Sequence, residues 1–344
     1  MILLKDIIEK HLNNYPKMQM QDLVKLIYQS EFGCGHFVSD KVNSLKFVKE
    51  ELEKTPACFE TPLFENIGDR FERINFSAMK NSELTPEIVN SLFVMSANQK
   101  TGTPEGFLQK LDMIKTSFNL DTDFFEKLMK ENNFSPISHS EEYRKLYNPA
   151  YRVIYSDYKL FIPILEKIES IISKKERICI TIDGRCAAGK TTLTKLLSSI
   201  YDTNVIHMDD FFLPLELRSE ERFKEPGGNI HYERFLNEVI NNIKNNNDFE
   251  YNVFDCSKMS YVEKKEVKIL PITIIEGSYS MRPEFREIYD LKIFVDVSKE
   301  EQKNRLLVRN RDMFQMFVDR FIPMEENYFN NLKIREQCDI VINL

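Results

Sequence analysis

The stretch that most constrains the fold is TIDGRCAAGKTTL, residues 181–193. It contains the pattern G-x4-G-K-T of a phosphate-binding loop, formed by Gly184, Gly189, Lys190 and Thr191. In such a loop, backbone N–H groups wrap the phosphates, the lysine reaches the terminal phosphate oxygens and the hydroxyl holds Mg²⁺. A β-branched apolar run precedes the pattern, and a helical pattern follows it at once. The sequence therefore predicts a nucleotide site at the start of a helix, rather than a plain glycine turn.

Short apolar runs, most of them separated by helical patterns, fill the second half of the chain. They cover residues 177–183, 203–208, 270–277, 291–297 and 338–344. Strands that alternate with helices form a parallel sheet whose two faces are covered. We therefore predict an α/β domain over residues 173–344, with a P-loop NTPase-type parallel sheet flanked by helices.

The first half of the chain, residues 1–172, predicts a different domain, one that is all-α. Helical spacing of apolar residues, or a helix-start signal, is found over 20–32, 85–99, 103–118 and 138–147. Two of these segments begin Thr-Pro-Glu, where threonine caps the helix and proline takes its first position. The segment at 138 begins with Ser138 and has Glu141 three residues later, which fits a capping box. The polar stretch SKKER at 173–177 marks the expected boundary.

Bulk properties exclude several classes of protein. With 344 residues the chain is long enough for two domains, and its formal net charge of −7 argues against a nucleic-acid partner. No apolar run approaches the ~18 residues of a membrane helix, so no membrane partner is expected. Six cysteines are scattered without a CxxC pair, and no signal segment precedes them. We therefore expect free thiols and a cytoplasmic protein. The oligomeric state stays open.

Two motifs in the first half leave alternatives open. EFGCGHFV brings Glu31, Cys34 and His36 together, either as a zinc site or as a helix C-cap followed by a tight turn, and we favour the turn. YRKLYNPAYR repeats tyrosine at 143, 147 and 151, either as a seam of the core or as a surface for a ligand. The role of this half is not predicted beyond recognition of an acceptor or regulation.

Whether the phosphoryl group is transferred to an acceptor is indicated by HMDDFFLP, residues 207–214, at the end of the second predicted strand. Asp209 and Asp210 would lie at the carboxyl edge of the sheet, where ligands bind in such folds. A carboxylate there can accept the proton of an attacking hydroxyl while Lys190 and Mg²⁺ neutralise the phosphoryl group. Acidic capping of a following helix is the alternative, and it weighs more for Asp210. The Asn-Lys-x-Asp motif that reads guanine is not found in the sequence.

These motifs together resemble the uridine kinase/phosphoribulokinase family of P-loop kinases, over roughly residues 177–344. The resemblance implies ATP and Mg²⁺ as cofactors and Asp209 as the catalytic base. TIIEGSYS resembles the end of the family's third strand, which implies that Glu276 lies near Mg²⁺ and the acceptor. The segment 294–312 resembles the family's fourth strand and Arg-bearing lid helix, which implies that Arg305, Arg309 and Arg311 are candidates to clamp the phosphates. Solvated helix charges are the alternative, and it weighs more for Arg311. The residues that would bind the nucleotide are Gly184, Arg185, Cys186, Ala187, Ala188, Gly189, Lys190, Thr191 and Thr192, with Thr191 and Glu276 at the metal.

The acceptor side departs from that family. Uridine kinases carry an aromatic-Asp-His-Pro segment whose Asp grips the ribose, whereas GGNIHYERF here has His231 and Tyr232. Asp255, in NVFDCSK, lies in a region that the family uses around the acceptor. Asp210, His231, Tyr232, Asp255 and Glu276 are therefore the expected contacts to a small-molecule acceptor, and uridine itself is doubtful.

Two functions follow. The first is ATP- and Mg²⁺-dependent phosphorylation of a hydroxyl on a small metabolite, related to a nucleoside by resemblance. The alternative is a nucleotide-dependent switch with slow hydrolysis, in which the helical half binds a partner. Asp209 separates them, because a switch needs no base directed at an acceptor hydroxyl.

Overall fold

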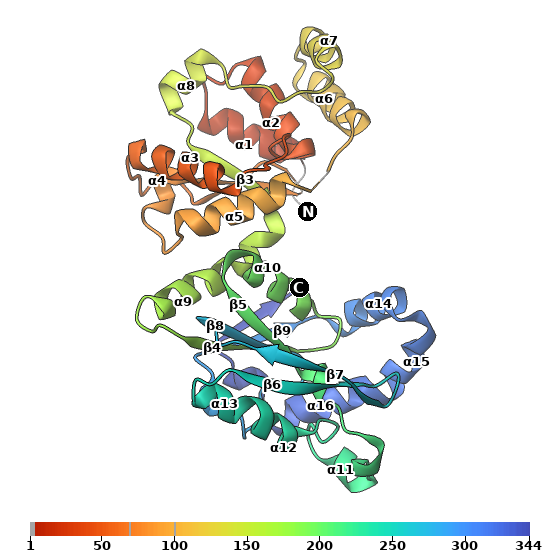
Figure 1. Cartoon of the computed structure of the whole chain (residues 1–344). Coiled ribbons are helices and arrows are strands. Elements are labelled where there is room, and N and C mark those ends of the chain that lie inside the picture. The colour runs from red at the N-terminus through yellow and green to blue at the C-terminus, as the bar shows by residue number, and fades with distance from the viewer. Residues whose placement is uncertain (1–3, 69, 100) are drawn as a thin grey trace. The chain divides into compact units, whose positions relative to one another are not determined.

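The chain forms two compact units, Met1–Glu166 and Lys167–Leu344, in a computed structural model that describes residues 4–68, 70–99 and 101–344 (Figure 1). The division falls inside helix α9 (Ile162–Ile172), and the boundary expected from the sequence follows the end of the same helix. Each unit has its own hydrophobic core.

The C-terminal unit is built on a five-stranded sheet in the order β10-β9-β4-β8-β5, and every neighbouring pair is parallel. The central strand, β4, is buried along its whole length, as expected for a sheet covered on both faces. Each predicted apolar run contains one of these strands, so the α/β class is confirmed. The strands are β4 (Ile178–Gly184), β5 (Thr203–His207), β8 (Ile272–Glu276), β9 (Leu291–Asp296) and β10 (Ile340–Asn343).

Helices cover both faces of this sheet. In Figure 1, α9 and α10 lie above the sheet, and α12, α13 and α16 lie below it. Helix α10 contacts β4, β5 and β8, whereas Tyr328 and Phe329 of α16 join the hydrophobic core on the sheet. The helices are α10 (Lys190–Ile200), α11 (Glu220–Lys224), α12 (Tyr232–Phe235), α13 (Asn241–Lys244), α14 (Lys299–Arg309), α15 (Phe314–Met316) and α16 (Ile322–Asn331), with π-helical turns at Leu236–Ile240 and Phe317–Phe321.

A β-hairpin in the C-terminal unit was not predicted. Strands β6 (Phe249–Asp255) and β7 (Ser260–Val267) pair antiparallel, with a register shift between Val253 and Phe254. Tyr251 and Val253 of β6 pack into the core. The charged β7, YVEKKEV after its first residue, is exposed along most of its length, so its sequence lacks the apolar pattern of a buried strand.

The N-terminal unit requires one correction, because it is not all-α. It holds a three-stranded antiparallel sheet, β1 (Phe64–Asn66), β2 (Phe71–Asn75) and β3 (Tyr151–Tyr155). These strands are short and carry charged residues, and β3 is far from β2 in the sequence, so no local pattern predicts the pairing. The helices are α1 (Leu4–Asn14), α2 (Met20–Phe32), α3 (Lys41–Lys54), α4 (Phe76–Met79), α5 (Pro86–Ala97), α6 (Pro104–Phe118), α7 (Asp123–Glu131) and α8 (Glu141–Tyr147).

The predicted helix starts are confirmed in two cases and corrected in a third. Thr85 and Thr103 cap α5 and α6, and each accepts a backbone N–H, with proline following. The cap of α8 is Ser140, which accepts the N–H of Tyr143, and not Ser138. Gly33 ends α2 at φ 65°, as the C-cap interpretation predicted.

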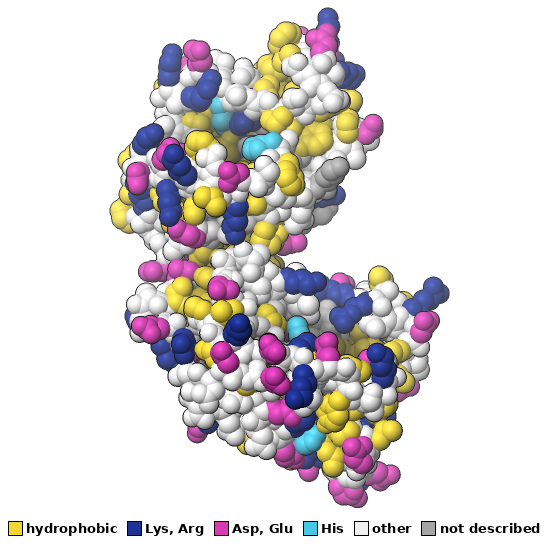
Figure 2. All heavy atoms as spheres, in the orientation of Figure 1, with side chains coloured by type: hydrophobic (Ala, Val, Ile, Leu, Met, Phe, Trp, Pro, Cys, Tyr) yellow, Lys and Arg dark blue, Asp and Glu magenta, His cyan; other side chains and the backbone are white. Residues whose placement is uncertain are grey.

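The exterior of the protein is charged. Figure 2 shows acidic and basic side chains interspersed over the visible face. Of the helices within the described ranges, none combines the length and the apolar character needed to span a membrane.

Candidate phosphoryl-transfer site

Three neighbouring strands deliver the predicted site residues to one edge of the sheet. The phosphate loop leaves β4 at Gly184, while Glu276 ends β8 and His207 ends β5. Strand β8 lies between the other two, and His207 pairs in register with Glu276. Because the strands are parallel, their carboxyl ends meet, and Asp209 follows two residues after β5.

The backbone of the loop needs its two pattern glycines. Gly184 has φ 137° and Gly189 φ 106°, and a Cβ built on Gly184 would lie 2.0 Å from the carbonyl oxygen of Val295. Ala187 also adopts a positive φ, 59°. Glycine accepts such conformations without a steric cost, so the chain can turn sharply from β4 into α10.

The ammonium group of Lys190 lies inside the loop. Nζ donates to the carbonyl oxygens of Gly184 at 2.8 Å and Arg185 at 2.9 Å, and to Ser278 Oγ at 3.3 Å. The residue is 8% exposed. A buried cation in a ring of amides is a suitable partner for a polyphosphate.

Glu276 lies between Thr191 and His207. Thr191 Oγ1 is 3.4 Å from Glu276 Oε1, and His207 Nδ1 is 2.7 Å from Glu276 Oε2. Burial alone would raise the pKa of Glu276, but the hydrogen bond from His207 and the charge of Lys190 hold it below its usual value. The hydrogen bond to Glu276 raises the pKa of His207.

A hydroxyl and an ionised carboxylate side by side are oxygen donors of the kind that Mg²⁺ accepts in nucleotide sites. These residues fit a magnesium ion that completes its shell with phosphate and water. In the described part of the chain, three or more His, Cys, Asp or Glu side chains nowhere gather as a metal cluster. Magnesium sites of this type need only one or two carboxylates.

Asp209 and Asp210 differ sharply in their surroundings. The carboxylate of Asp210 accepts from Tyr251 Oη at 2.9 Å and forms an ion pair with Lys265 at 2.9 Å. Asp209 is exposed, and no hydrogen bond or ion pair joins its carboxylate to another described residue. Protein atoms crowd it closely enough that loss of solvation raises its pKa, with Lys190 opposing the shift.

Only one of the two lid arginines contacts the loop. Arg305 Nη1 lies 3.4 Å from the carbonyl oxygen of Ala187 and 3.5 Å from that of Ala188, while its Nε donates to Glu301 at 2.8 Å. Arg309 is exposed at the end of α14. The sequence placed both on one helix face, but the structure brings Arg305 alone to the cradle.

The expected acceptor contacts are engaged within the protein. His231 caps α12 through Nδ1, 3.3 Å from the N–H of Arg234, and lies 3.2 Å from Glu233. The ring of Tyr232 lies beside the guanidinium groups of Arg222 and Arg282, each 3.8 Å from its centroid.

Asp255 is also engaged, at the tip of the β6–β7 hairpin. Its Oδ1 accepts the N–H and the hydroxyl of Ser257, at 2.7 and 2.6 Å. A side chain that closes a turn in this way has a structural reason for its position. His231, Tyr232 and Asp255 thus each have contacts of their own within the protein, and their role towards an acceptor stays a prediction.

Sequence reasoning missed several residues that contact the loop. Ser278 Oγ contacts the Gly184 carbonyl, Gln302 contacts Cys186, and Glu325 accepts the N–H of Cys186. Ser278 had a signal, since it lies two residues after Glu276 at the same strand end. Gln302 and Glu325 had none, because their position depends on how α14 and α16 pack.

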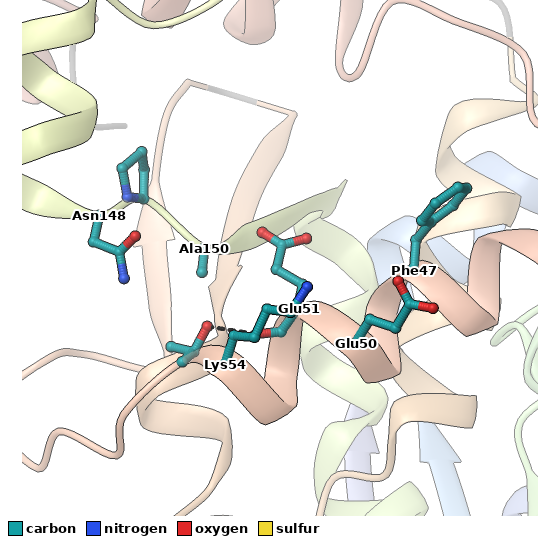
Figure 3. A pocket seen from close by; sticks show the side chains of 8 residues that line it. Phe47, Glu50, Glu51, Lys54, Asn148 and Ala150 are labelled. Atoms are coloured by element: carbon teal, nitrogen blue, oxygen red, sulfur yellow. Dashed lines mark hydrogen bonds between the residues drawn. The ribbon is translucent and has the colours of Figure 1, made fainter.

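A separate hollow lies in the N-terminal unit (Figure 3). Four of its residues come from α3 and three precede β3, and Thr55 Oγ1 donates to the Glu51 carbonyl oxygen at 2.8 Å. The carboxylate of Glu51 is paired with Arg152 at 2.7 Å. We place the candidate active site at the phosphate loop, because the Lys190, Thr191, Glu276 and Asp209 set lies there and not at this hollow.

Curated relatives match the C-terminal half of the chain. The uridine kinase of Chlamydia pneumoniae is 28% identical over 183 residues, which cover 48% of this chain and 80% of that protein. The uridine kinase of Clostridium botulinum strain Okra is 29% identical over 151 residues, 40% of this chain and 70% of that protein. No protein-family model matches the chain.

Among solved structures, a protein described as a possible uridine kinase from Bacillus stearothermophilus aligns with a TM-score of 0.40 at 19% identity. It covers 52% of this chain and 99% of that one. The phosphate loop after the central strand β4, Glu276 at the end of β8 and Asp209 shortly after β5 are the features of a P-loop kinase fold in the C-terminal unit. The resemblance to uridine kinase-like P-loop kinases is confirmed for this half of the chain.

Proposed function

We propose that the protein is a kinase that transfers the terminal phosphoryl group of ATP, with Mg²⁺, to a hydroxyl of a small metabolite. The observation that carries this proposal is the free carboxylate of Asp209. It lies on the carboxyl edge of the sheet, while the adjacent Asp210 is occupied by Tyr251 and Lys265. A carboxylate without a partner, within the field of Lys190 and Glu276, is suited to take a proton.

Each residue has a defined task in this reaction. Asp209 accepts the proton of the acceptor hydroxyl as the new oxygen–phosphorus bond forms and the bond to the leaving diphosphate breaks. Lys190 and Arg305 stabilise the negative charge on the phosphoryl oxygens. Thr191 and Glu276 would hold Mg²⁺, which offsets charge between the terminal phosphates when it is bound.

The raised pKa of Asp209 favours this role. Loss of solvation raises the pKa of Asp209, with Lys190 opposing the shift, and a raised pKa makes a carboxylate a stronger proton acceptor. The hydrogen bond from His207 fixes the orientation of Glu276, so the metal side of the site is held in place before ligands arrive.

The proposed acceptor is a nucleoside or a related hydroxylated metabolite. Its support is the similarity to proteins named uridine kinase. Against uridine itself stands the segment with His231 and Tyr232, both of which are engaged within the protein. All six cysteines are free, which is typical of a reducing compartment and supports a cytoplasmic location.

The test compares Asp209→Asn with Asp210→Asn. Release of ADP from Mg·ATP is measured against a panel of nucleosides, sugars and phosphosugars. We expect acceptor-dependent ADP release by the wild type, and a loss of about 10²-fold or more in kcat for Asp209→Asn, because a general base is removed. Binding of ATP to that variant is expected to be unchanged.

Asp210→Asn is the matched control, since it removes the same charge one residue away. It is expected to keep the reaction within about threefold and to lose stability, because Lys265 loses the negative charge with which it pairs. Slow ADP release that ignores every acceptor and both variants would instead support a nucleotide-dependent switch. Unchanged acceptor-dependent turnover in Asp209→Asn would refute the proposed base.

A further inference from the structure

The backbone of Cys186, inside the phosphate loop, is held on both sides by side chains from outside the loop. Its N–H donates to Glu325 Oε2 at 3.0 Å. Gln302 Nε2 donates to its carbonyl oxygen at 3.2 Å and lies 3.2 Å from its Sγ. Glu325 is 5% and Gln302 1% exposed. Two buried polar side chains thus contact the same residue of the phosphate loop.

Glu325 reaches the loop by a second route through Ser278. Ser278 Oγ is 2.7 Å from Glu325 Oε1 and 2.9 Å from the carbonyl oxygen of Gly184, and it also accepts from Lys190. Burial raises the pKa of Glu325, and the charge of Lys190 opposes that shift. Burying a carboxylate is costly even when it is paired, so stability alone gives no reason for one here.

Gln302 and Glu325 lie on the two helices that flank one segment of the chain. Gln302 belongs to α14, which ends at Arg309, and Glu325 belongs to α16, which begins at Ile322. We call residues 310–321 the bracketed segment. The helix before this segment also contacts the loop at another point. Arg305 of α14 lies 3.4 Å, through Nη1, from the carbonyl oxygen of Ala187.

Helix α16 also contacts the base of the loop on its next turn. Tyr328 Oη donates to Asp183 Oδ2 at 2.7 Å, directly before Gly184. Glu326 accepts from Arg185 Nε at 2.7 Å, through the side chain of Arg185 rather than its backbone. Both ends of the bracketed segment are therefore attached to the loop, and among the described side chains Glu325 and Gln302 are the two that bond the Cys186 backbone.

We propose that Glu325 and Gln302 are positioning residues for the nucleotide, which act by fixing the Cys186 backbone and so couple the loop to the bracketed segment. The inference rests on the proposed function only in taking the loop as the nucleotide site. In Glu325→Gln one acceptor oxygen becomes an NH₂ donor. That side chain cannot accept from both Cys186 and Ser278, although it keeps the size of the original.

The first test is the dissociation constant of Mg²⁺ with a non-hydrolysable ATP analogue, measured by calorimetry. We expect Glu325→Gln to weaken binding about tenfold or more, because one of the two oxygens that accept from Cys186 and Ser278 is replaced by a donor. Glu326→Gln is the matched control: it removes the same charge from the next residue but leaves the loop backbone alone, and a change below about threefold is expected.

The second test uses limited trypsin digestion to measure whether nucleotide binding at the loop protects the bracketed segment from cleavage. Arg311 and Arg320 are exposed in the bracketed segment and offer cleavage sites. Saturating analogue is expected to slow cleavage there in the wild type and in Glu326→Gln, and to do so much less in Glu325→Gln. A change that only weakened the fold would accelerate cleavage with and without the analogue alike.

Gln302→Ala provides a second variant in case Glu325→Gln does not fold, and the same direction of change is expected. Unchanged affinity and unchanged protection in these variants would overturn the inference. A wild type that binds no nucleotide would overturn the proposed function itself, so the two failures are distinguishable.

Discussion

At the scale of single residues, the C-terminal unit assigns different tasks to neighbours in the sequence. Asp209 and Asp210 carry the same side chain, yet one is free and the other holds the β6–β7 hairpin through Tyr251 and Lys265. The same holds for Glu325 and Glu326, of which only the first contacts the loop backbone. The direction in which each side chain leaves the backbone decides its role.

His207 is another residue whose role is visible only in the structure. It lies two residues before Asp209, but no motif in the sequence marks it. It contacts Glu276 at 2.7 Å because β5 and β8 are neighbours in register. A histidine that orients the carboxylate proposed to hold Mg²⁺ is a positioning residue.

We predict that His207→Ala raises the Mg²⁺ concentration needed for half-maximal activity about tenfold, because Glu276 loses its orienting partner. His207→Gln should recover much of that loss, since its amide can donate to the carboxylate. The measurement is the dependence of the initial rate on Mg²⁺ at saturating ATP and acceptor. The same Mg²⁺ dependence in His207→Ala and wild type would contradict this role.

At the scale of elements, the N-terminal unit depends on a capping residue that has two partners. Ser140 accepts the N–H of Tyr143 at the start of α8, and it donates from Oγ to Asp22 Oδ2 at 2.7 Å. Asp22 is fully buried and also accepts from the N–H of Ser140 and from His139. The start of α8 is thereby fixed to α2.

We predict that Ser140→Ala destabilises the N-terminal unit by about 3 kcal/mol, the sum of a lost cap and a lost hydrogen bond to a buried charge. Thr85→Ala is the control, because Thr85 caps α5 through the N–H of Ile88 only, and a loss of about 1 kcal/mol is expected. Urea unfolding followed by circular dichroism measures both. Equal losses in the two variants would show that the contact with Asp22 contributes nothing.

At the scale of the whole molecule, the two units bury titratable groups with opposite consequences for stability. In the N-terminal unit, burial and the charge of Arg73 lower the pKa of His139 to about 3, against the attraction of Asp22. In the C-terminal unit, burial beneath the loop raises the pKa of Asp183 to about 6. The two groups therefore titrate on different sides of their ordinary values.

We predict that the N-terminal unit loses stability as the pH falls from about 6.5 towards 3. In that window the unfolded chain binds a proton at His139 that the folded unit excludes, at up to about 1.4 kcal/mol per pH unit. Asp183 acts in the reverse direction: its contribution is present below its unfolded pKa, near 4, and is lost as the pH rises through 6.

Thermal unfolding between pH 7 and pH 4 measures the effect, with His139→Gln expected to show a shallower dependence on pH than the wild type. His36→Gln removes an exposed histidine from the same unit and serves as the control. A pH dependence that His139→Gln leaves unchanged would contradict the prediction. Such a result would mean that other groups dominate acid unfolding.

Much of the C-terminal unit could be predicted from local sequence. The apolar runs are long and β-branched, so they identify the strands, and the glycine pattern identifies the loop that follows β4. The β6–β7 hairpin was not predicted because β7 is charged and exposed. The sheet of the N-terminal unit was not predicted because its strand β2 contains the buried Arg73. Arg73 is paired with Glu65 and Gln29, and a local apolar pattern does not indicate a buried arginine.

The position of the tyrosines in the YRKLYNPAYR motif could not be predicted from local sequence either. Their spacing left a core seam and a ligand surface open. The structure buries Tyr143 at 1% exposure, stacked on His139 with the ring centroids 4.3 Å apart, and it joins Tyr151 to His139 at 2.7 Å. The ring of Tyr15, far earlier in the sequence, also packs against Tyr143 with the centroids 5.4 Å apart, and such a contact decided between the two interpretations.

The sequence by itself determined the phosphate loop, the parallel sheet and the proposed base, because each depends on neighbours along the chain or on a strand end. Tertiary structure alone decided which carboxylate is free, which arginine reaches the loop, and that Gln302 and Glu325 grip Cys186. The contacts of Gln302 and Glu325 with Cys186 join residues more than a hundred positions apart. Local propensity carries no information about such pairs, since packing of whole helices and strands brings them together.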